Sequence, residues 1–465
     1  METQQLSERL EFRGGPLMSV VPMVVFLAST VYLVARGAAV EQGMIVAAMA
    51  GIAAGMLFVR DVAGYSERIF SLMANRIATV AVVCWIWAGA FSAILADSGL
   101  VESIIWIGWK LDLTGAAFTL VTFVSASLFA VTVGTGLGTV VGFTAVMYPA
   151  GVVLGAYPPA LLGAIFSGAA FGDNLAPVSD TTIVSAATQE TDVGGVVRSR
   201  LKYSLTACAL AAVLFALTGG GEAGVSADQA QRLLAERANP AALPMLIPAF
   251  LVFVCAVSGF HFLAALNIGI AAALVVGPLT GVFPLERFFS ISGNGVVSGS
   301  LVRGMLGMLP ISVLTLLLVT ANGLMEAAGF LDRVLDWLSR TVAHTVRGAE
   351  MAIVALISLA NLFVPVNTIA MVTVGPLANR LRKKLSIHPY RVANLLDTIS
   401  CSFPFLLPYS ATMVAAVAIQ RDLAASYSFV PVLSWAQMAP WIFYSIVLFP
   451  LMIIAVITGF GRKRG

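Results

Sequence analysis

Asp173 and Asp180 stand seven residues apart in a polar segment that interrupts an otherwise apolar stretch. Amide and hydroxyl side chains accompany them: Asn174, Ser179, Thr181 and Thr182. Oxygen donors of this kind are the ligands that hard cations prefer. Because burial favours the neutral form of a carboxylate, a buried aspartate can also bind a proton near neutral pH. The segment therefore predicts a site at which Na⁺ and H⁺ compete, with Asp173 and Asp180 as the Na⁺ ligands.

Further candidates lie in three other interruptions of apolar sequence. Asp397 joins Asp173 and Asp180 as a candidate for proton coupling. Two other roles remain open, because aspartates can cap half-helices and a hydroxyl group can hydrogen bond to its own helix. The additional candidate cation- or substrate-binding residues are Thr135, Thr139, Asn367, Thr368, Asp397, Thr398, Ser400, Ser410 and Thr412.

The composition identifies the solvent around these segments. Hydrophobic residues make up 59% of the 465 residues and charged residues 11%, at a mean hydropathy of +0.95, whereas a soluble domain carries about 25% charged residues. Each charge placed in a membrane span costs about 2.5 to 3.5 kcal/mol, so aspartates in such spans are functional candidates. The chain is predicted to be an all-α polytopic membrane protein. Its net charge of +3 gives no indication of a nucleic-acid partner.

The sequence lacks the residues that several classes of enzyme require. The sequence contains neither a Gly-x-x-x-x-Gly-Lys-Ser/Thr loop nor a His-Glu-x-x-His motif, which argues against ATP-driven transport within this chain and against zinc hydrolysis. An intramembrane aspartyl protease also pairs aspartates, but its Gly-x-Gly-Asp motif fails because Ala170 stands where glycine is needed. The four cysteines lack the spacing of a disulfide or metal motif. We therefore expect neither an enzyme nor a cofactor.

The interruptions recur in two halves of the chain. Each half is predicted to contain five crossings, one of them a broken helix, and a re-entrant hairpin. Local matches between the halves occur in the same order and at a nearly constant offset, with Ser179 aligned to Tyr409, and they support a duplication. The interrupted segments are Thr119–Ala150, Tyr157–Glu190, Met351–Ala378 and Val392–Gln420.

The distribution of basic residues orients this arrangement. Because five crossings are an odd number, the second half is inverted and both chain ends lie on the same side. With the N-terminus inside, 19 of the 26 Lys and Arg residues lie inside and 7 outside, as the positive-inside rule requires. Arg200 and Arg391 belong to the inside set. The predicted organisation is a cytoplasmic tail at 1–16, a first inverted repeat at 17–220, an external linker at 221–242, a second inverted repeat at 243–460 and a basic cytoplasmic tail at 461–465.

The segment Gly172–Thr182 resembles the signature of the NhaC family of Na⁺/H⁺ antiporters, within the ion transporter superfamily, and the hairpin tip Gly134–Thr139 is similar to that family. The resemblance implies Na⁺/H⁺ exchange by alternating access, an elevator-type movement, a homodimer and a bacterial inner membrane. Asn367–Thr368 resembles the hairpin tips that hold Na⁺ or a substrate carboxylate in dicarboxylate carriers of the superfamily. The second half departs from the family pattern at Leu396–Ser400 and Leu407–Tyr409, which leaves the substrate open.

An alternative function uses the same elements. Helix ends at a break expose both amide and carbonyl groups, so the site can hold an anion as well as a cation. Relatives of the NhaC family exchange organic acids such as malate and lactate. The alternative is therefore a Na⁺- or H⁺-coupled carrier or exchanger of a small organic acid or an amino acid. A channel is disfavoured, because broken helices in inverted repeats serve alternating access better than an open pore.

Overall fold

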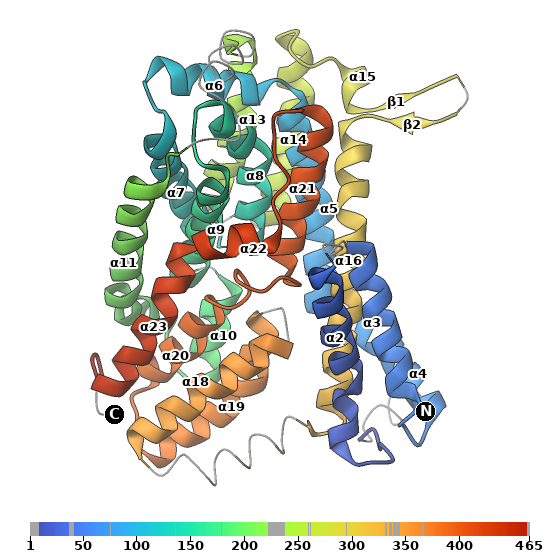
Figure 1. The fold of residues 1–465 in the computed structure, drawn as a ribbon, viewed down its shortest axis with the longest axis vertical. Coiled ribbons are helices and arrows are strands. Elements are labelled where there is room, and N and C mark those ends of the chain that lie inside the picture. The colour runs from blue at the N-terminus through green and yellow to red at the C-terminus, as the bar shows by residue number, and fades with distance from the viewer. Residues whose placement is uncertain are drawn as a thin grey trace.

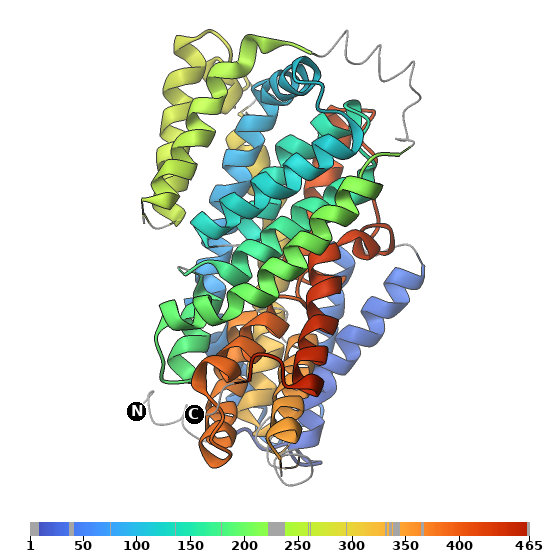
Figure 2. The same ribbon diagram turned by 90° about the vertical axis from the view of Figure 1, so that its left-hand side faces the viewer.

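The computed structural model describes residues 9–462, with gaps at 37–40, 75, 135, 178, 222–237, 259, 261, 294, 331–332, 334–336, 338–344 and 364–366. The described residues form an elongated bundle of helices, from which the antiparallel hairpin β1 (Ser290–Ile291) and β2 (Val297–Ser298) projects at one end (Figure 1). The two chain ends lie toward the same end of the bundle in both views (Figures 1 and 2).

The long helices α5 (Arg76–Asp97) and α16 (Ser300–Ala327) cross at glycines. A Cβ atom added to Gly304 would lie 2.3 Å from the carbonyl oxygen of Gly89, so a larger residue would force the two helices apart. Helices α2 and α3 pack against each other, as do α13 and α14. The bounds of these helices and of the other short elements around α5 and α16 are η1 (Pro16–Val20), α2 (Val21–Ala35), α3 (Glu41–Met56), α4 (Val62–Met73), α6 (Leu100–Lys110), η2 (Pro240–Met245), α13 (Leu246–Val257), α14 (Phe262–Leu279) and α15 (Leu285–Phe288).

Four consecutive helices occur twice with the same spacing. The first set is α7 (Gly115–Val133), α8 (Gly136–Val153), α9 (Pro158–Leu175) and α10 (Asp180–Thr188). The second set is α18 (Val346–Phe363), α19 (Asn367–Lys384), α20 (Pro389–Ser400) and α21 (Ala411–Ser426). The offset that pairs Gly115 with Val346 also pairs the first residues of the other three helices, and we call it the repeat offset. The α7/α8 pair lies in the upper half of Figure 1 and the α18/α19 pair in the lower half.

The repeat offset corrects the alignment made from the sequence. It pairs Ser179 with Ser410 rather than with Tyr409, and both serines are the N-caps of their helices, α10 and α21. The sequence match is therefore wrong by one residue at this point, because the short similarity around Ser179 contains no feature that distinguishes neighbouring registers.

Helix α9 is enclosed by protein on every side. All 18 of its residues are buried. Small residues permit the close packing, since a Cβ atom added to Gly172 would lie 2.1 Å from the Cβ of Ala130 in α7. Helices α8, α11 (Val193–Thr218) and α23 (Phe443–Thr458) also pack against α9. The first predicted functional segment therefore starts from a helix that does not face lipid.

The chain is a multi-pass membrane protein. Among the described residues, four helical segments are long and apolar enough to span a bilayer: Pro16–Leu33, Gly136–Val153, Val193–Thr218 and Ser300–Ala327. Two bent pairs raise this number to six, namely Ile86–Asp97 with Leu100–Lys110 and Trp435–Trp441 with Phe443–Thr458. The second pair, α22 (Trp435–Met438) and η3 (Ala439–Trp441) followed by α23, bends by 58°. The apolar run from Ser434 to Phe460 is thus a further interrupted segment that the hydropathy does not reveal.

Candidate ion-binding site at two broken helices

The first break separates α9 from α10. Helix α9 ends at Leu175, and Pro177 follows, which has no backbone N–H with which to continue the helix. Ser179 caps the next helix, because its hydroxyl accepts a hydrogen bond from the backbone N–H of Thr181. Asp173, in the last turn of α9, therefore stands beside an interruption in the backbone rather than inside a continuous span.

Asp173 connects the first break to the α18/α19 pair. Its side chain is buried, and Ser179 Oγ donates a hydrogen bond to Oδ1 over 2.9 Å. The amide of Asn367, the first residue of α19, donates to Oδ2 over 3.0 Å. Thr181 Oγ1 donates to the backbone carbonyl of Asp173 over 3.2 Å. Three other candidate residues, from two distant segments of the sequence, thus hydrogen bond to Asp173, two of them to its carboxylate.

The second break repeats the hydroxyl geometry without that carboxylate. Ser410 accepts a hydrogen bond from the backbone N–H of Met413 and lies 3.2 Å from the hydroxyl of Thr412. Thr412 Oγ1 donates to the backbone carbonyl of Pro404 over 3.2 Å, just as Thr181 donates to that of Asp173. At the repeat offset, Pro404 therefore occupies the position of Asp173.

Asp397 lies in the last turn of α20 and is fully buried. Its Oδ2 atom forms an ion pair with Nη2 of Arg200 in α11 at 2.5 Å and accepts a hydrogen bond from Ser185 in α10 over 3.1 Å. The thiol of Cys401 donates to Oδ1 over 3.1 Å. The carboxylate of Asp397 is thus contacted by residues from both halves of the chain.

Arg200 is a site residue that the sequence analysis missed. The charge distribution counts it only among the inside basic residues, and its side chain is fully buried in α11. The reason is its position on a helix: Arg198 and Lys202 are exposed, whereas Arg200 lies about 200° around the helix from Arg198. The alternation of these three basic residues is the signal that could have revealed it. Arg391, assigned to the same side, is likewise buried, paired with Glu350 at 2.9 Å.

Cys401 lies between the two carboxylates. Its sulfur is 3.9 Å from Oδ2 of Asp173, 3.1 Å from Oδ1 of Asp397 and 3.8 Å from the hydroxyl of Thr181. The thiol is fully buried. Its place between two candidate acids could not be read from an isolated cysteine.

The structure does not bring all the predicted site residues together. Asn174 turns its side-chain oxygen away from Asp173, toward the hydroxyls of Ser204 (2.6 Å) and Tyr444 (3.1 Å). Ser400 accepts a hydrogen bond from Asn361 of α18 over 2.9 Å. The other positions are as follows: Thr182 accepts a hydrogen bond from Arg200, Thr368 donates its backbone N–H to the side chain of Asn367, and Thr139 and Thr398 are buried.

Thr135 and the side chain of Asp180 lie outside the described residues, although the backbone of Asp180 begins α10. Within the part of the chain that the structure describes, no three His, Cys, Asp or Glu side chains gather as a metal site.

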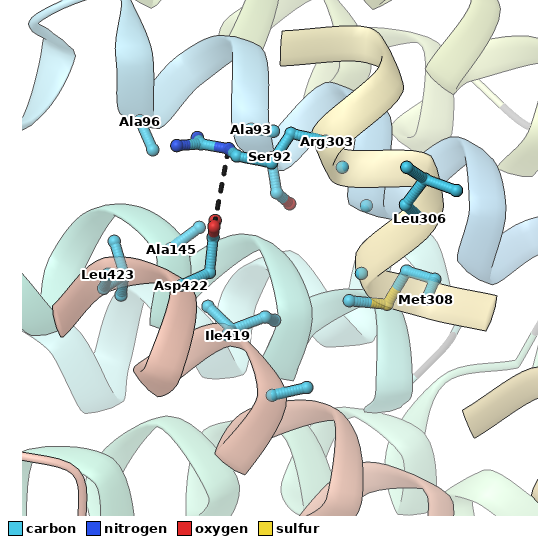
Figure 3. Close-up of a pocket in the computed structure, with 14 residues that line it drawn as sticks. Ser92, Ala93, Ala96, Ala145, Arg303, Leu306, Met308, Ile419, Asp422 and Leu423 are labelled. Atoms are coloured by element: carbon cyan, nitrogen blue, oxygen red, sulfur yellow. Dashed lines mark ion pairs between the residues drawn. The ribbon is translucent and has the colours of Figure 1, made fainter. Parts of the chain in front are cut away.

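A second charged cluster lies between α5, α16 and α21. Arg303 of α16 contacts Asp97 of α5 at 2.6 Å and Asp422 of α21 at 3.4 Å. Arg303 and Asp422 face a cavity of about 360 Å³ that is lined mainly by small and apolar residues (Figure 3). This cluster connects the second broken helix to the crossed pair α5 and α16.

A membrane-embedded bundle whose broken helices carry buried charges is typical of an ion-coupled transporter. The model of the Na⁺/H⁺ antiporter family matches residues 7–220 and 238–459, and the chain belongs to this family. The resemblance to NhaC antiporters in the sequence is confirmed, since NhaC is among the relatives below. The family is one of transporters rather than enzymes.

Three named relatives are antiporters. The malate-2H⁺/Na⁺-lactate antiporter of Bacillus subtilis (strain 168) is 28% identical over 61% of this chain, and the match covers 63% of that relative, less than two thirds of its length. The Na⁺/H⁺ antiporter NhaC of Alkalihalophilus pseudofirmus is 23% identical over 70% of this chain and 72% of its own. The arginine/ornithine antiporter ArcD of Halobacterium salinarum is 25% identical over 73% and 72%, respectively.

Among solved structures, Neisseria gonorrhoeae MtrF, described as illuminating a class of antimetabolite efflux pumps, aligns with a TM-score of 0.43 at 13% identity. The alignment covers 84% of this chain and 82% of that chain.

Proposed function

We propose that this protein exchanges Na⁺ for H⁺ across the membrane, with Asp173 as the carboxylate that binds one ion or the other. The observation that carries the proposal is the burial of Asp173 between Ser179 of the first break and Asn367 of the second hairpin tip. A carboxylate enclosed in this way can be neutralised by a proton or by Na⁺ but not by both together. Competition of this kind is sufficient to couple the two ions.

The surroundings of Asp173 favour a cation. The hydroxyls of Ser179 and Thr181 supply hard oxygen ligands within hydrogen-bonding distance of this residue. The C-terminal end of α9 adds the partial negative charge of its helix dipole, although the carbonyls of Asp173 and Asn174 already accept hydrogen bonds from Thr181 and Arg200. We propose that Asp180 supplies a second carboxylate. Asp397 is proposed to take part in proton coupling through its negative charge, which Arg200 holds in place, rather than by binding the proton itself.

Alternating access is proposed from the arrangement of the two helix sets. The constant repeat offset, with the α7/α8 and α18/α19 pairs at opposite halves of the bundle, supports two inverted repeats (Figure 1). In an elevator-type movement, these sets would move against the crossed pair α5 and α16. We further propose ten crossings, a homodimer, cytoplasmic chain ends and a bacterial inner membrane.

The proposal is tested in proteoliposomes with an imposed pH gradient and a trapped pH-sensitive dye. We expect Na⁺, and not K⁺, to collapse the gradient, and we expect Asp173→Asn and Asp180→Asn to abolish the response. Asp112→Asn, at an exposed aspartate, is the matched control and should exchange normally. Full cation-driven exchange by Asp173→Asn would refute the assignment of Asp173, and full exchange by Asp180→Asn would refute that of Asp180.

The alternative is a Na⁺- or H⁺-coupled carrier of an organic acid or amino acid. It is favoured by the printed activities of two relatives, a malate/lactate antiporter and an arginine/ornithine antiporter. The same vesicles distinguish the two functions. A gradient that no cation collapses until a dicarboxylate or an amino acid is added would replace the first proposal by the second.

A further inference from the structure

Arg200 is the feature of the site that the proposed exchange leaves unexplained. Its guanidinium is fully buried and forms the 2.5 Å ion pair with Asp397. It also donates hydrogen bonds to the side chains of Asn394 (3.3 Å) and Thr182 (3.2 Å) and to the backbone carbonyl of Asn174. Burying a cation in this way is costly unless it is paired, so its presence beside a transport site requires an account.

The guanidinium has two properties that define what it can do. It does not lose its proton under ordinary conditions, so it cannot carry one through the cycle. It is also tied to α9, α10 and α20 at once, through Asn174, Thr182 and Asp397. Arg200 therefore acts as a fixed positive charge at the meeting point of the two breaks.

That charge lies next to the proposed Na⁺ ligands. Asn174, whose carbonyl Arg200 contacts, directly follows Asp173, and Thr182 directly follows Thr181. One sulfur atom, that of Cys401, separates the carboxylates of Asp173 and Asp397. At such range, in a medium of low dielectric, a full charge changes the binding of a cation substantially.

Resting on the proposed function, we propose that Arg200 is a built-in counter-cation of Asp397. By cancelling the charge of that carboxylate, it weakens Na⁺ binding at Asp173 enough for the ion to be released on the far side. Arg200 is thus a positioning and affinity-setting residue rather than an ion ligand. Without it, Asp397 would attract the transported cation as a second uncompensated acid.

The test is the apparent Na⁺ affinity of charge variants, measured in two ways at alkaline pH, where protons compete least. One readout is the Na⁺ concentration for half-maximal exchange in proteoliposomes. The other is half-maximal thermal stabilisation by Na⁺ in detergent, which does not require transport. We expect Arg200→Gln to tighten Na⁺ binding and Asp397→Asn to weaken it, each by about tenfold. The double variant should return close to the wild type.

Three controls separate this role from a merely structural one. Arg200→Lys keeps the charge and should keep the wild-type affinity, whereas Arg198→Gln removes an exposed charge two residues away and should change nothing. Gel filtration identifies variants that fail to fold. If Arg200→Gln is unstable, the double variant, which leaves no buried charge unpaired, is compared with Asp397→Asn, and its tighter Na⁺ binding carries the test.

The outcomes are distinct. Opposite shifts in the two single variants would support the inference. Equal loss of maximal exchange with unchanged Na⁺ affinity would assign the ion pair to stability alone and overturn it. A wild-type protein that is stabilised by Na⁺ but does not exchange it would refute the proposed function while leaving the role of Arg200 testable by binding. A wild-type protein that neither binds nor exchanges Na⁺ would overturn both.

Discussion

The two breaks share a backbone framework and differ in charge. In each, a serine caps the following helix, and the threonine two residues later hydrogen bonds to a carbonyl eight residues before it. That carbonyl belongs to Asp173 in the first break and to Pro404 in the second. The shared framework therefore holds the two half-helices apart in each break, and the carboxylate is present at this position in the first break alone. The comparison separates residues that maintain the break from the residue that we propose to bind the ion.

Among variants of the two breaks, replacement of Asp173 should have the largest effect on the exchange rate. Asp173→Asn keeps the size and hydrogen-bonding capacity but removes the charge, so exchange should fall by at least about 100-fold. Pro404→Ala, at the matching position of the second break, should exchange at a rate close to that of the wild type. Dye-based exchange in proteoliposomes, normalised to folded protein from gel filtration, gives the answer. Equal losses in both variants would mean that the two breaks are not functionally different.

The two N-cap serines, Ser179 and Ser410, provide a second comparison of the two breaks. Ser179→Ala and Ser410→Ala each remove one cap and should lower stability similarly, by about 0.5 to 2 kcal/mol, which is visible as a lower Tm in detergent. Ser179 also donates to Asp173, so its loss should in addition weaken apparent Na⁺ affinity by about tenfold. The idea fails if Ser410→Ala weakens Na⁺ affinity as much as Ser179→Ala does.

The threonines should differ by less. Thr181→Val removes a hydroxyl that lies 2.9 Å from that of Ser179 and donates to the carbonyl of Asp173. One hydrogen bond contributes about 0.5 to 1.5 kcal/mol, so Na⁺ affinity should fall by a few-fold. Thr412→Val makes the same change in the second break and should alter only stability. Half-saturating Na⁺ concentrations for the two variants, measured side by side, decide the point.

The smallest effect is expected where the first broken helix is anchored to the second set. The pKa of the exposed Glu190 is lowered from its ordinary value of 4.5, mainly by the hydrogen bond from Lys383 and then by that from Asn379. Because its folded pKa is depressed, Glu190 stabilises the fold above about pH 4.5, and this contribution is lost as the pH falls through the lower value.

Glu190→Gln should therefore lower Tm slightly at neutral pH and reduce the further loss on acidification. Thermal unfolding in detergent at neutral and acidic pH provides the measurement, with Glu286→Gln as a control outside this cluster. The effect is small because exposed ion pairs contribute little. An equal change in the control variant would show that Glu190 has no particular anchoring role.

The sequence allows the breaks to be predicted but not all of the contacts across them. Polar residues within apolar stretches indicated both interrupted segments, and Asn367 stood among the candidates that now lie near Asp173. Counting charges could not identify Arg200 as a buried residue of the site, because the count treats every basic residue near a helix end as exposed. The orientation of Asn174 toward Tyr444 depends on α23, about 270 residues away in the sequence, and no local pattern reports it.

The complete enclosure of α9 has a consequence for the biosynthesis of the protein. A helix that touches no lipid gains its stability from neighbours, and α23, which covers part of α9, lies near the end of the described chain. Helix α9, which carries Asp173, therefore remains incompletely covered until α23 has been made. Partially assembled membrane segments are prone to misassociation. The helix that carries the proposed exchange residue therefore depends for its cover on a segment about 270 residues later in the sequence.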